Sequence, residues 1–306
     1  MLAILPIFIR LPLVALLAVL NMLAHASVLL ILAVIKALIP IPPFRTWISK
    51  ILIVIGEQWI AVNGMLFGLF TRTRWTVDGL EGLNRGGWYL VLSNHQSWVD
   101  IPVLQRTFNR RIPFLKFFLK QQLIWVPVIG LAWWALDFPF MRRYTKEQLE
   151  QHPEWRGKDK EATRKACERF RHLPVSVMNF VEGTRFTPAK HAKQESPYAN
   201  LLRPRAGGVA FVLETMGDML QSIIDVTIVY PNGQPTLIDL LANRITEIRV
   251  QVRQLPIPRE FVDGDYEGDA EFRAKFQTWI SGIWREKDGV IGSMRDELSP
   301  IRTHDR

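Results

Sequence analysis

Residues 11–35 form a nearly uninterrupted apolar run, which constrains the possible folds more than any other feature of the chain. As a helix rising 1.5 Å per residue, this run is about 37 Å long, enough to cross a hydrocarbon core of roughly 30 Å. It therefore predicts a transmembrane helix over about residues 11–36. A cleaved signal peptide is the alternative, because Ala24-His25-Ala26 resembles a cleavage site. The run continues beyond this site to Ile35, which favours a retained anchor.

A second apolar stretch follows at residues 51–70, after three closely spaced prolines at positions 40, 42 and 43. It contains Glu57, Gln58 and Asn63. A carboxylate in the middle of a span is costly, so we expect an interfacial or half-inserted helix. A buried helix of a soluble domain fits equally well. We therefore divide the chain into a membrane anchor, residues 1–72, and a globular domain, residues 73–306.

The chain is basic, with 38 Lys and Arg residues against 29 Asp and Glu residues and a formal charge of +9. This excess suits an anionic partner, such as a phospholipid membrane or a phosphorylated substrate. A large basic domain after the first helix favours an integral protein of a bacterial inner membrane, with this domain facing the cytoplasm. The single cysteine excludes an internal disulfide, and no histidine spacing indicates a zinc site. We therefore expect no metal and no cofactor.

Residues 88–92 form a continuous apolar run that is typical of a buried strand. Further strands are expected over residues 75–77, 175–181, 223–230 and 245–255, and helices over residues 158–172, 207–219 and 272–284. Strands interleaved with helices predict an α/β layer fold.

His95 follows the predicted strand 88–92, and Asp100 lies five residues later. Within one continuous helix these side chains would be about 140° apart, so they can meet only if His95 lies in the turn before a helix. Ser97 is a suitable N-cap, with Asp100 at the third helical position. The alternative is that Ser97 and Asp100 form a capping box and that His95 is an ordinary turn residue. The motif alone favours neither interpretation.

A second polar segment, Glu182-Gly183-Thr184-Arg185, follows the predicted strand 175–181. Gly183 lets another group approach the backbone, and Arg185 offers a fork of donors suited to a phosphate. Glu182 could hold Arg185 or accept a hydrogen bond from a substrate hydroxyl, and Thr184 could donate to a phosphate. A tight turn with a surface ion pair is the alternative.

The two segments together resemble the glycerolipid acyltransferases, which include the 1-acylglycerol-3-phosphate and related lysophospholipid acyltransferases. Two weaker blocks, residues 138–143 and 226–231, also resemble this family, and the resemblance covers roughly residues 75–235. The family usually has Pro before the Glu and often Ser after the Arg, whereas Val181 and Phe186 stand there in this chain. With His191 soon after, the second segment is closer to the eukaryotic branch that acts on several lipids.

The resemblance implies a mixed sheet flanked by helices, with His95 as general base and Asp100 as its partner. It also implies a set of substrate-binding residues: Asn94, Arg143, Glu182, Gly183, Thr184, Arg185 and Pro231. The expected reaction moves an acyl chain from acyl-CoA or acyl carrier protein to 1-acylglycerol-3-phosphate, giving phosphatidic acid. Lysophosphatidylglycerol or lysophosphatidylinositol is an alternative acceptor.

Three other functions compete with this reaction. A membrane-tethered lipid-binding module without catalysis is one alternative. A lipid hydrolase using Ser93 or Ser97 would need a Gly-x-Ser-x-Gly elbow, which the chain lacks. Nucleic-acid binding is disfavoured, because only the net charge indicates it.

Overall fold

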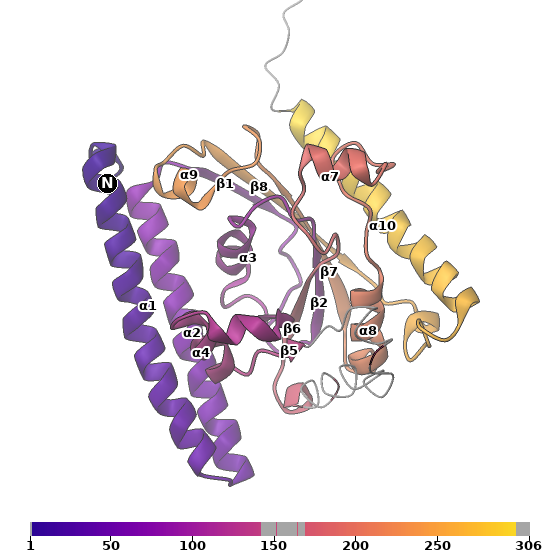
Figure 1. The fold of residues 1–306 in the computed structure, drawn as a ribbon, viewed down its shortest axis with the longest axis horizontal. Helices are drawn as coiled ribbons and strands as arrows, with labels where there is room; N and C mark the ends of the chain where they lie inside the picture. Colours follow the sequence, from indigo (N-terminus) through magenta and orange to yellow (C-terminus); the bar gives the residue numbers. More distant parts are fainter. Residues whose placement is uncertain (1, 142–150, 152–163, 165–168, 298–306) are drawn as a thin grey trace, which may run out of the picture.

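A six-stranded sheet forms the centre of the computed structural model, which describes residues 2–141, 151, 164 and 169–297 (Figure 1). The strand order is β1-β8-β7-β2-β6-β3. The strands are β1 (Arg74–Asp78), β2 (Tyr89–Ser93), β3 (Leu115–Phe117), β6 (Ser176–Phe180), β7 (Ser222–Val229) and β8 (Glu247–Leu255). β7 and β8 pair antiparallel, whereas the other neighbouring pairs are parallel. The predicted mixed sheet is therefore confirmed.

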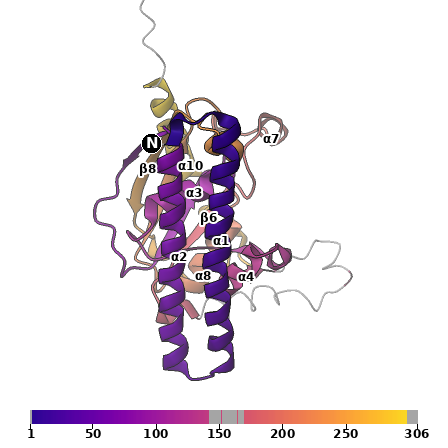
Figure 2. The ribbon, with the colours of Figure 1, turned by 90° about the vertical axis from the view of Figure 1, so that its left-hand side faces the viewer.

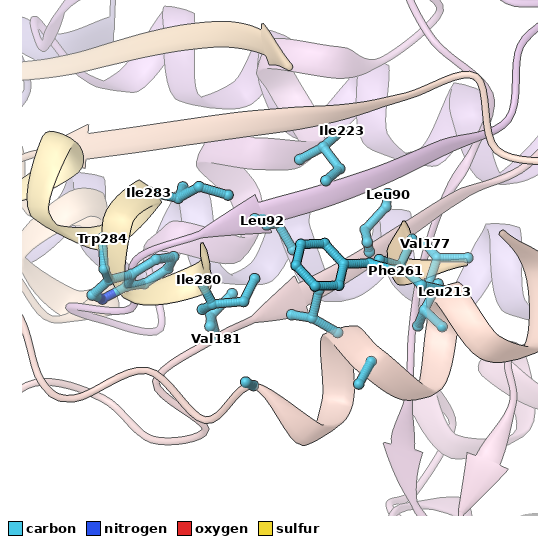
Figure 3. Packing of buried hydrophobic residues seen from close by; sticks show 14 of the residues in the cluster. Leu90, Leu92, Val177, Val181, Leu213, Ile223, Phe261, Ile280, Ile283 and Trp284 are labelled. Atoms are coloured by element: carbon cyan, nitrogen blue, oxygen red, sulfur yellow. The ribbon is translucent and has the colours of Figure 1, made fainter. Parts of the chain in front are cut away.

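Strand β2 lies in the middle of the sheet and is buried along its whole length, as its continuous apolar sequence predicts. Leu90 and Leu92 pack on one face against α8 (Gly207–Met216) and α10 (Ala270–Asp296), as Figure 3 shows. Tyr89 and Val91 pack on the other face against α3 (Asp100–Phe108). Helices therefore cover both faces of the central strand.

A buried charge cluster holds α10 against the sheet. The Lys287 Nζ lies 2.7 Å from Oδ1 of Asp225 on β7 and donates to the Val226 carbonyl oxygen at 2.5 Å. Arg253 on β8 binds the other Asp225 oxygen at 2.7 Å. Burial lowers the pKa of Lys287, while Asp225 opposes that change. Because a buried charge requires a partner, these contacts set the position of α10 on the sheet.

Two long helices, α1 (Ile7–Leu38) and α2 (Pro42–Phe70), form a hairpin along one side of the domain (Figures 1 and 2). Both are long and apolar enough to cross a membrane. Helix α1 contains the predicted span and extends beyond it at both ends. The predicted start of the second helix at residue 51 is wrong, because α2 begins at Pro42. Proline is favourable in the first turn of a helix, where its missing N–H has no partner to lose.

Glu57 of α2 points at the globular domain and is buried there. The Glu57 carboxylate accepts a hydrogen bond from Arg85 at 2.5 Å, and the Glu57 backbone carbonyl oxygen accepts one from the Asn109 side chain at 3.1 Å. The charge that argued against a long apolar helix is thus paired with protein groups.

The hairpin is tied to the domain near both ends of α1. Arg10 donates to the Ala242 carbonyl oxygen at 2.6 Å, and Lys36 pairs with Asp137 at 2.5 Å. Between these ties, α1 and α2 share a large apolar cluster with the domain. Its buried members include Leu29, Leu52, Phe114, Leu119, Leu136 and Phe138.

The remaining elements are short. They are η1 (Leu2–Ile4), β4 (Leu119–Lys120), η2 (Gln121–Trp125), α4 (Ile129–Ala135), β5 (Phe140–Met141), η4 (Arg169–His172), α7 (Pro188–Lys193), α9 (Leu237–Leu241) and η5 (Arg259–Phe261). Most of the helix predicted over residues 158–172 lies outside the described residues, as does Arg143.

Candidate active site

The site lies where the central strand β2 ends and the chain turns into α3. Asn94, the first residue after β2, is fully buried and spans to β7. Its side-chain NH₂ donates to the Ile228 carbonyl oxygen, and its side-chain Oδ1 accepts from the Ile228 N–H, both at 2.9 Å. These two hydrogen bonds tie the end of β2 to β7 and fix the backbone directly before His95.

His95 and Asp100 are in direct contact. The His95 Nδ1 lies 2.8 Å from the Asp100 Oδ2, with the imidazole 13% exposed and the carboxylate completely buried. Because a carboxylate only accepts, Nδ1 carries the proton and Nε2 is left as the basic nitrogen. One face of the imidazole is covered by Phe180, whose ring stacks on it at a centroid distance of 3.8 Å.

The turn before α3 has a different form from the predicted one. His95 does lie in this turn, but Ser97 is not the N-cap, because α3 begins at Asp100 after Val99. The Ser97 hydroxyl instead accepts from the Val99 N–H and donates to the Pro235 carbonyl oxygen. The Asp100 Oδ2 accepts the Ser97 N–H at 2.9 Å, which is half of a capping box. The same oxygen therefore caps the turn and holds His95.

Tyr230 is a site residue that the sequence did not reveal. Its hydroxyl donates to the Asp100 Oδ1 at 2.6 Å, and the ring is buried at the end of β7. Burial raises the pKa of Tyr230 well above its ordinary value, and the neighbouring Asp100 charge adds to this. The only signal in the sequence was its place beside Pro231 in the weaker block 226–231.

Glu182, at the end of β6, is 1% exposed. Its Oε1 accepts the His95 N–H at 2.9 Å, and its Oε2 accepts the Leu202 N–H at 3.0 Å. Burial raises the pKa of Glu182 to about 7, although these two backbone hydrogen bonds oppose the shift. The carboxylate is thus engaged by the backbone on both sides.

The other residues of the second segment lie around the same turn. Gly183 has a φ of +66°, and a Cβ there would lie 3.0 Å from the Arg205 side chain. The Thr184 hydroxyl accepts a hydrogen bond from Lys190 at 2.7 Å. Arg185 is exposed, and its guanidinium lies 5.1 Å from the centre of the Trp98 ring.

Pro231 directly follows Tyr230 at the same edge of the sheet and is half-buried.

Within the described ranges, no group of three or more His, Cys, Asp or Glu side chains is arranged to hold a metal ion. The arrangement offers a fixed proton acceptor, the His95 Nε2, with an exposed cation on the neighbouring turn.

A sequence profile of the acyltransferase family matches residues 74–231, slightly more than half of the chain. The chain belongs to the acyltransferase family. This assignment confirms the family predicted from the two polar segments, and the matched region contains both of them.

Relatives of this chain include two mouse proteins and one human protein. It is 26% identical over 213 residues to the mouse 1-acyl-sn-glycerol-3-phosphate acyltransferase delta, covering 65% of this chain and 51% of the relative. The mouse gamma protein is 26% identical over 215 residues, covering 66% and 52%. The human delta protein is 25% identical over 256 residues, covering 79% and 60%. The chain therefore spans between half and three-fifths of the length of these relatives.

Among solved structures, one match is the crystal structure of the 1-acyl-sn-glycerophosphate (LPA) acyltransferase PlsC from Thermotoga maritima. Its TM-score is 0.44 at 16% identity, covering 89% of this chain and 95% of that one.

Replacing Tyr230 with Phe should lower acyl-transfer turnover about tenfold, because Asp100 loses one hydrogen bond worth about 1.4 kcal/mol. Tyr89→Phe is the matched control, since this buried tyrosine lies at the start of β2, and β2 ends two residues before His95. Steady-state kcat of both purified variants tests the expectation. Wild-type turnover in Tyr230→Phe would show that Asp100 needs no support from β7.

Proposed function

We propose that this protein moves a fatty acyl chain from a thioester to the free hydroxyl of a lysophospholipid. The observation that carries the proposal is the contact of the His95 Nδ1 with a completely buried Asp100 carboxylate. This contact leaves the Nε2 as a base of fixed orientation at the end of a rigid strand. The similarity to 1-acyl-sn-glycerol-3-phosphate acyltransferases supports the choice of reaction.

In the proposed step, the His95 Nε2 removes the proton of the acceptor hydroxyl as its oxygen attacks the thioester carbonyl carbon. The new C–O bond forms, the C–S bond breaks, and the thiolate leaves. The imidazolium then gives its proton to the leaving thiolate, so the thiol is the second product and the base is restored. Asp100 stabilises the imidazolium, which is the role of the acid in a serine hydrolase triad. The substrate hydroxyl is the nucleophile, so no nucleophilic side chain is required.

The proposed acceptor is 1-acylglycerol-3-phosphate, and the product is phosphatidic acid. The exposed Arg185 at the site turn and the net charge of +9 support a phosphorylated acceptor. Lysophosphatidylglycerol and lysophosphatidylinositol share the phosphate and are the alternative acceptors. Acyl-CoA or acyl carrier protein is the proposed donor. A panel of lysophospholipids and both donors, assayed with the purified protein, distinguishes these cases.

We also propose that the protein is held in a bacterial inner membrane with its domain in the cytoplasm. Helices α1 and α2 support membrane attachment by their length and apolar composition. Leu237 and Ile238 of α9 and Trp98 near His95 are exposed apolar residues. Since the Ser97 hydroxyl binds the Pro235 carbonyl oxygen, these residues belong to linked segments at the site edge. A membrane lipid could therefore reach the site along an apolar surface.

Alanine in place of His95 should reduce turnover at least ~10²–10⁴-fold while the protein remains folded and membrane-bound. His25→Ala is the control, because His25 lies on α1 and its Nδ1 contacts the Asn21 carbonyl oxygen. Asp100→Asn should be similarly damaging. Near-normal turnover in His95→Ala would refute the mechanism, and an inactive wild type that binds lipid would favour the non-catalytic module.

Arg185→Lys should raise the KM for the lysophospholipid, and Arg185→Ala should raise it further, because Arg can bind two phosphate oxygens and Lys acts as a point charge. The KM for the thioester and the kcat of the Lys variant should change little. Arg171→Lys is the control, an exposed arginine that pairs with Asp218. Titrating each substrate separately decides the matter. An unchanged acceptor KM in both Arg185 variants would contradict the assignment.

Alkaline carbonate should leave the full-length protein in the membrane fraction, because release would require the apolar α1 and α2 to enter water. N-terminal sequencing of the same fraction should show that residues 11–36 are retained. Release of full-length protein, or a mature start at Ser27, would contradict membrane attachment through α1.

A further inference from the structure

We propose that Glu182 positions His95 for catalysis instead of binding the substrate. Its carboxylate joins the backbone of His95 to the loop of residues 194–205 and thereby fixes the imidazole relative to the reacting hydroxyl. This inference rests on the proposed acyl transfer by His95 and assigns a role to the acidic residue of the second segment.

The backbone of His95 lies outside any regular element, between the end of β2 and the start of α3. A backbone group in such a turn needs a partner from elsewhere in the fold. Glu182 accepts the His95 N–H at 2.9 Å, and the Phe186 N–H donates to the His95 carbonyl oxygen at 2.7 Å. The segment from Glu182 to Phe186 therefore holds both polar backbone groups of His95, while Asp100 holds its ring.

The second Glu182 oxygen accepts the Leu202 N–H at 3.0 Å. The loop that carries Leu202 is itself attached to α10, since the Asp288 carboxylate accepts the N–H groups of Ala199 and Asn200 at 2.8 and 2.7 Å. Glu182 thus links His95 to a loop with its own anchor. With both oxygens engaged and 1% of the residue exposed, the carboxylate is not available to a substrate hydroxyl.

The two hydrogen bonds that Glu182 accepts, from the His95 and Leu202 N–H groups, form a clamp on His95. This clamp depends on charge, because an ionised carboxylate accepts at both oxygens and a protonated one carries a donor on one of them. Burial raises the pKa of Glu182 to about 7. The Asp100 charge raises it further, whereas Lys287 of α10 and the two backbone N–H groups lower it. Arg205, from the same loop as Leu202, lies over the adjacent Gly183. Protonation of Glu182 as the pH falls through about 7 should therefore weaken the hold on His95.

Glu182→Gln separates positioning from substrate binding. The glutamine keeps the size of the side chain but can accept only one of the two N–H groups, since its NH₂ faces the other donor. We expect kcat to fall roughly 10–100-fold, as for a base displaced by about 1 Å, with each substrate KM within about twofold of wild type. Glu247→Gln is the matched control, because Glu247 is a buried carboxylate paired with Arg74 and Arg249. This control should keep wild-type kcat.

The pH profile gives a readout that a merely structural role would not change. Protonation of Glu182 should lower wild-type kcat by the same roughly 10–100-fold as the glutamine substitution, as the pH falls through about 7. In Glu182→Gln this transition is absent, so the ratio of wild-type to variant kcat should fall toward one below that pH, and near it the wild-type acid limb should be steeper than tenfold per pH unit. The wild-type limb alone tests the inference even if the variant fails to fold.

Several outcomes would overturn the proposal. A raised acceptor KM with an unchanged kcat in Glu182→Gln would make Glu182 a substrate ligand, and unchanged kinetics would remove any role. A single-proton acid limb in the wild type would contradict the charge-dependent clamp. Failure of the proposed function is distinguishable, since His95→Ala would then retain turnover or the wild type would show no acyl transfer.

Discussion

The site depends on one buried carboxylate that accepts four hydrogen bonds. Asp100 Oδ2 accepts from the His95 Nδ1 and from the N–H groups of Gln96 and Ser97, and its Oδ1 accepts from the Tyr230 hydroxyl. A completely buried charge is tolerated only when such donors surround it. The same bonds shape the turn before α3, set the tautomer of His95 and join the end of β2 to β7. The geometry of the proposed active site and the local fold therefore depend on the same carboxylate.

The local parts of this arrangement could be predicted from the sequence. Strand β2 is a short apolar run, and His95 and Asp100 lie five residues apart, so their meeting needs only one turn in the right place. The contacts of Tyr230 and Glu182 could not be predicted this way. Tyr230 reaches Asp100 across 130 positions, and Glu182 reaches His95 across 87. Only the order of strands in the sheet brings such residues together.

The second helix shows a different limit of sequence reasoning. Rules for a charge inside an apolar segment assume that lipid surrounds the helix. Glu57 instead faces the domain and binds Arg85, so its charge does not shorten α2. The start of α2 at Pro42 was missed for a related reason. A proline cluster ends one helix, but the same residue type is also favourable at the start of the next.

The apolar cluster that α1 and α2 share with the domain makes the hairpin part of the folding unit. Leu29 and Leu52 pack in one buried cluster with Phe114, Leu136 and their apolar neighbours. Without the hairpin, the domain residues of this cluster would be exposed to water, and the domain would tend to associate with itself. Exchanging the hairpin for an unrelated pair of helices would leave the same apolar residues exposed. One side of this helix pair therefore covers the domain, while the other side carries exposed apolar side chains of the kind that suit a membrane.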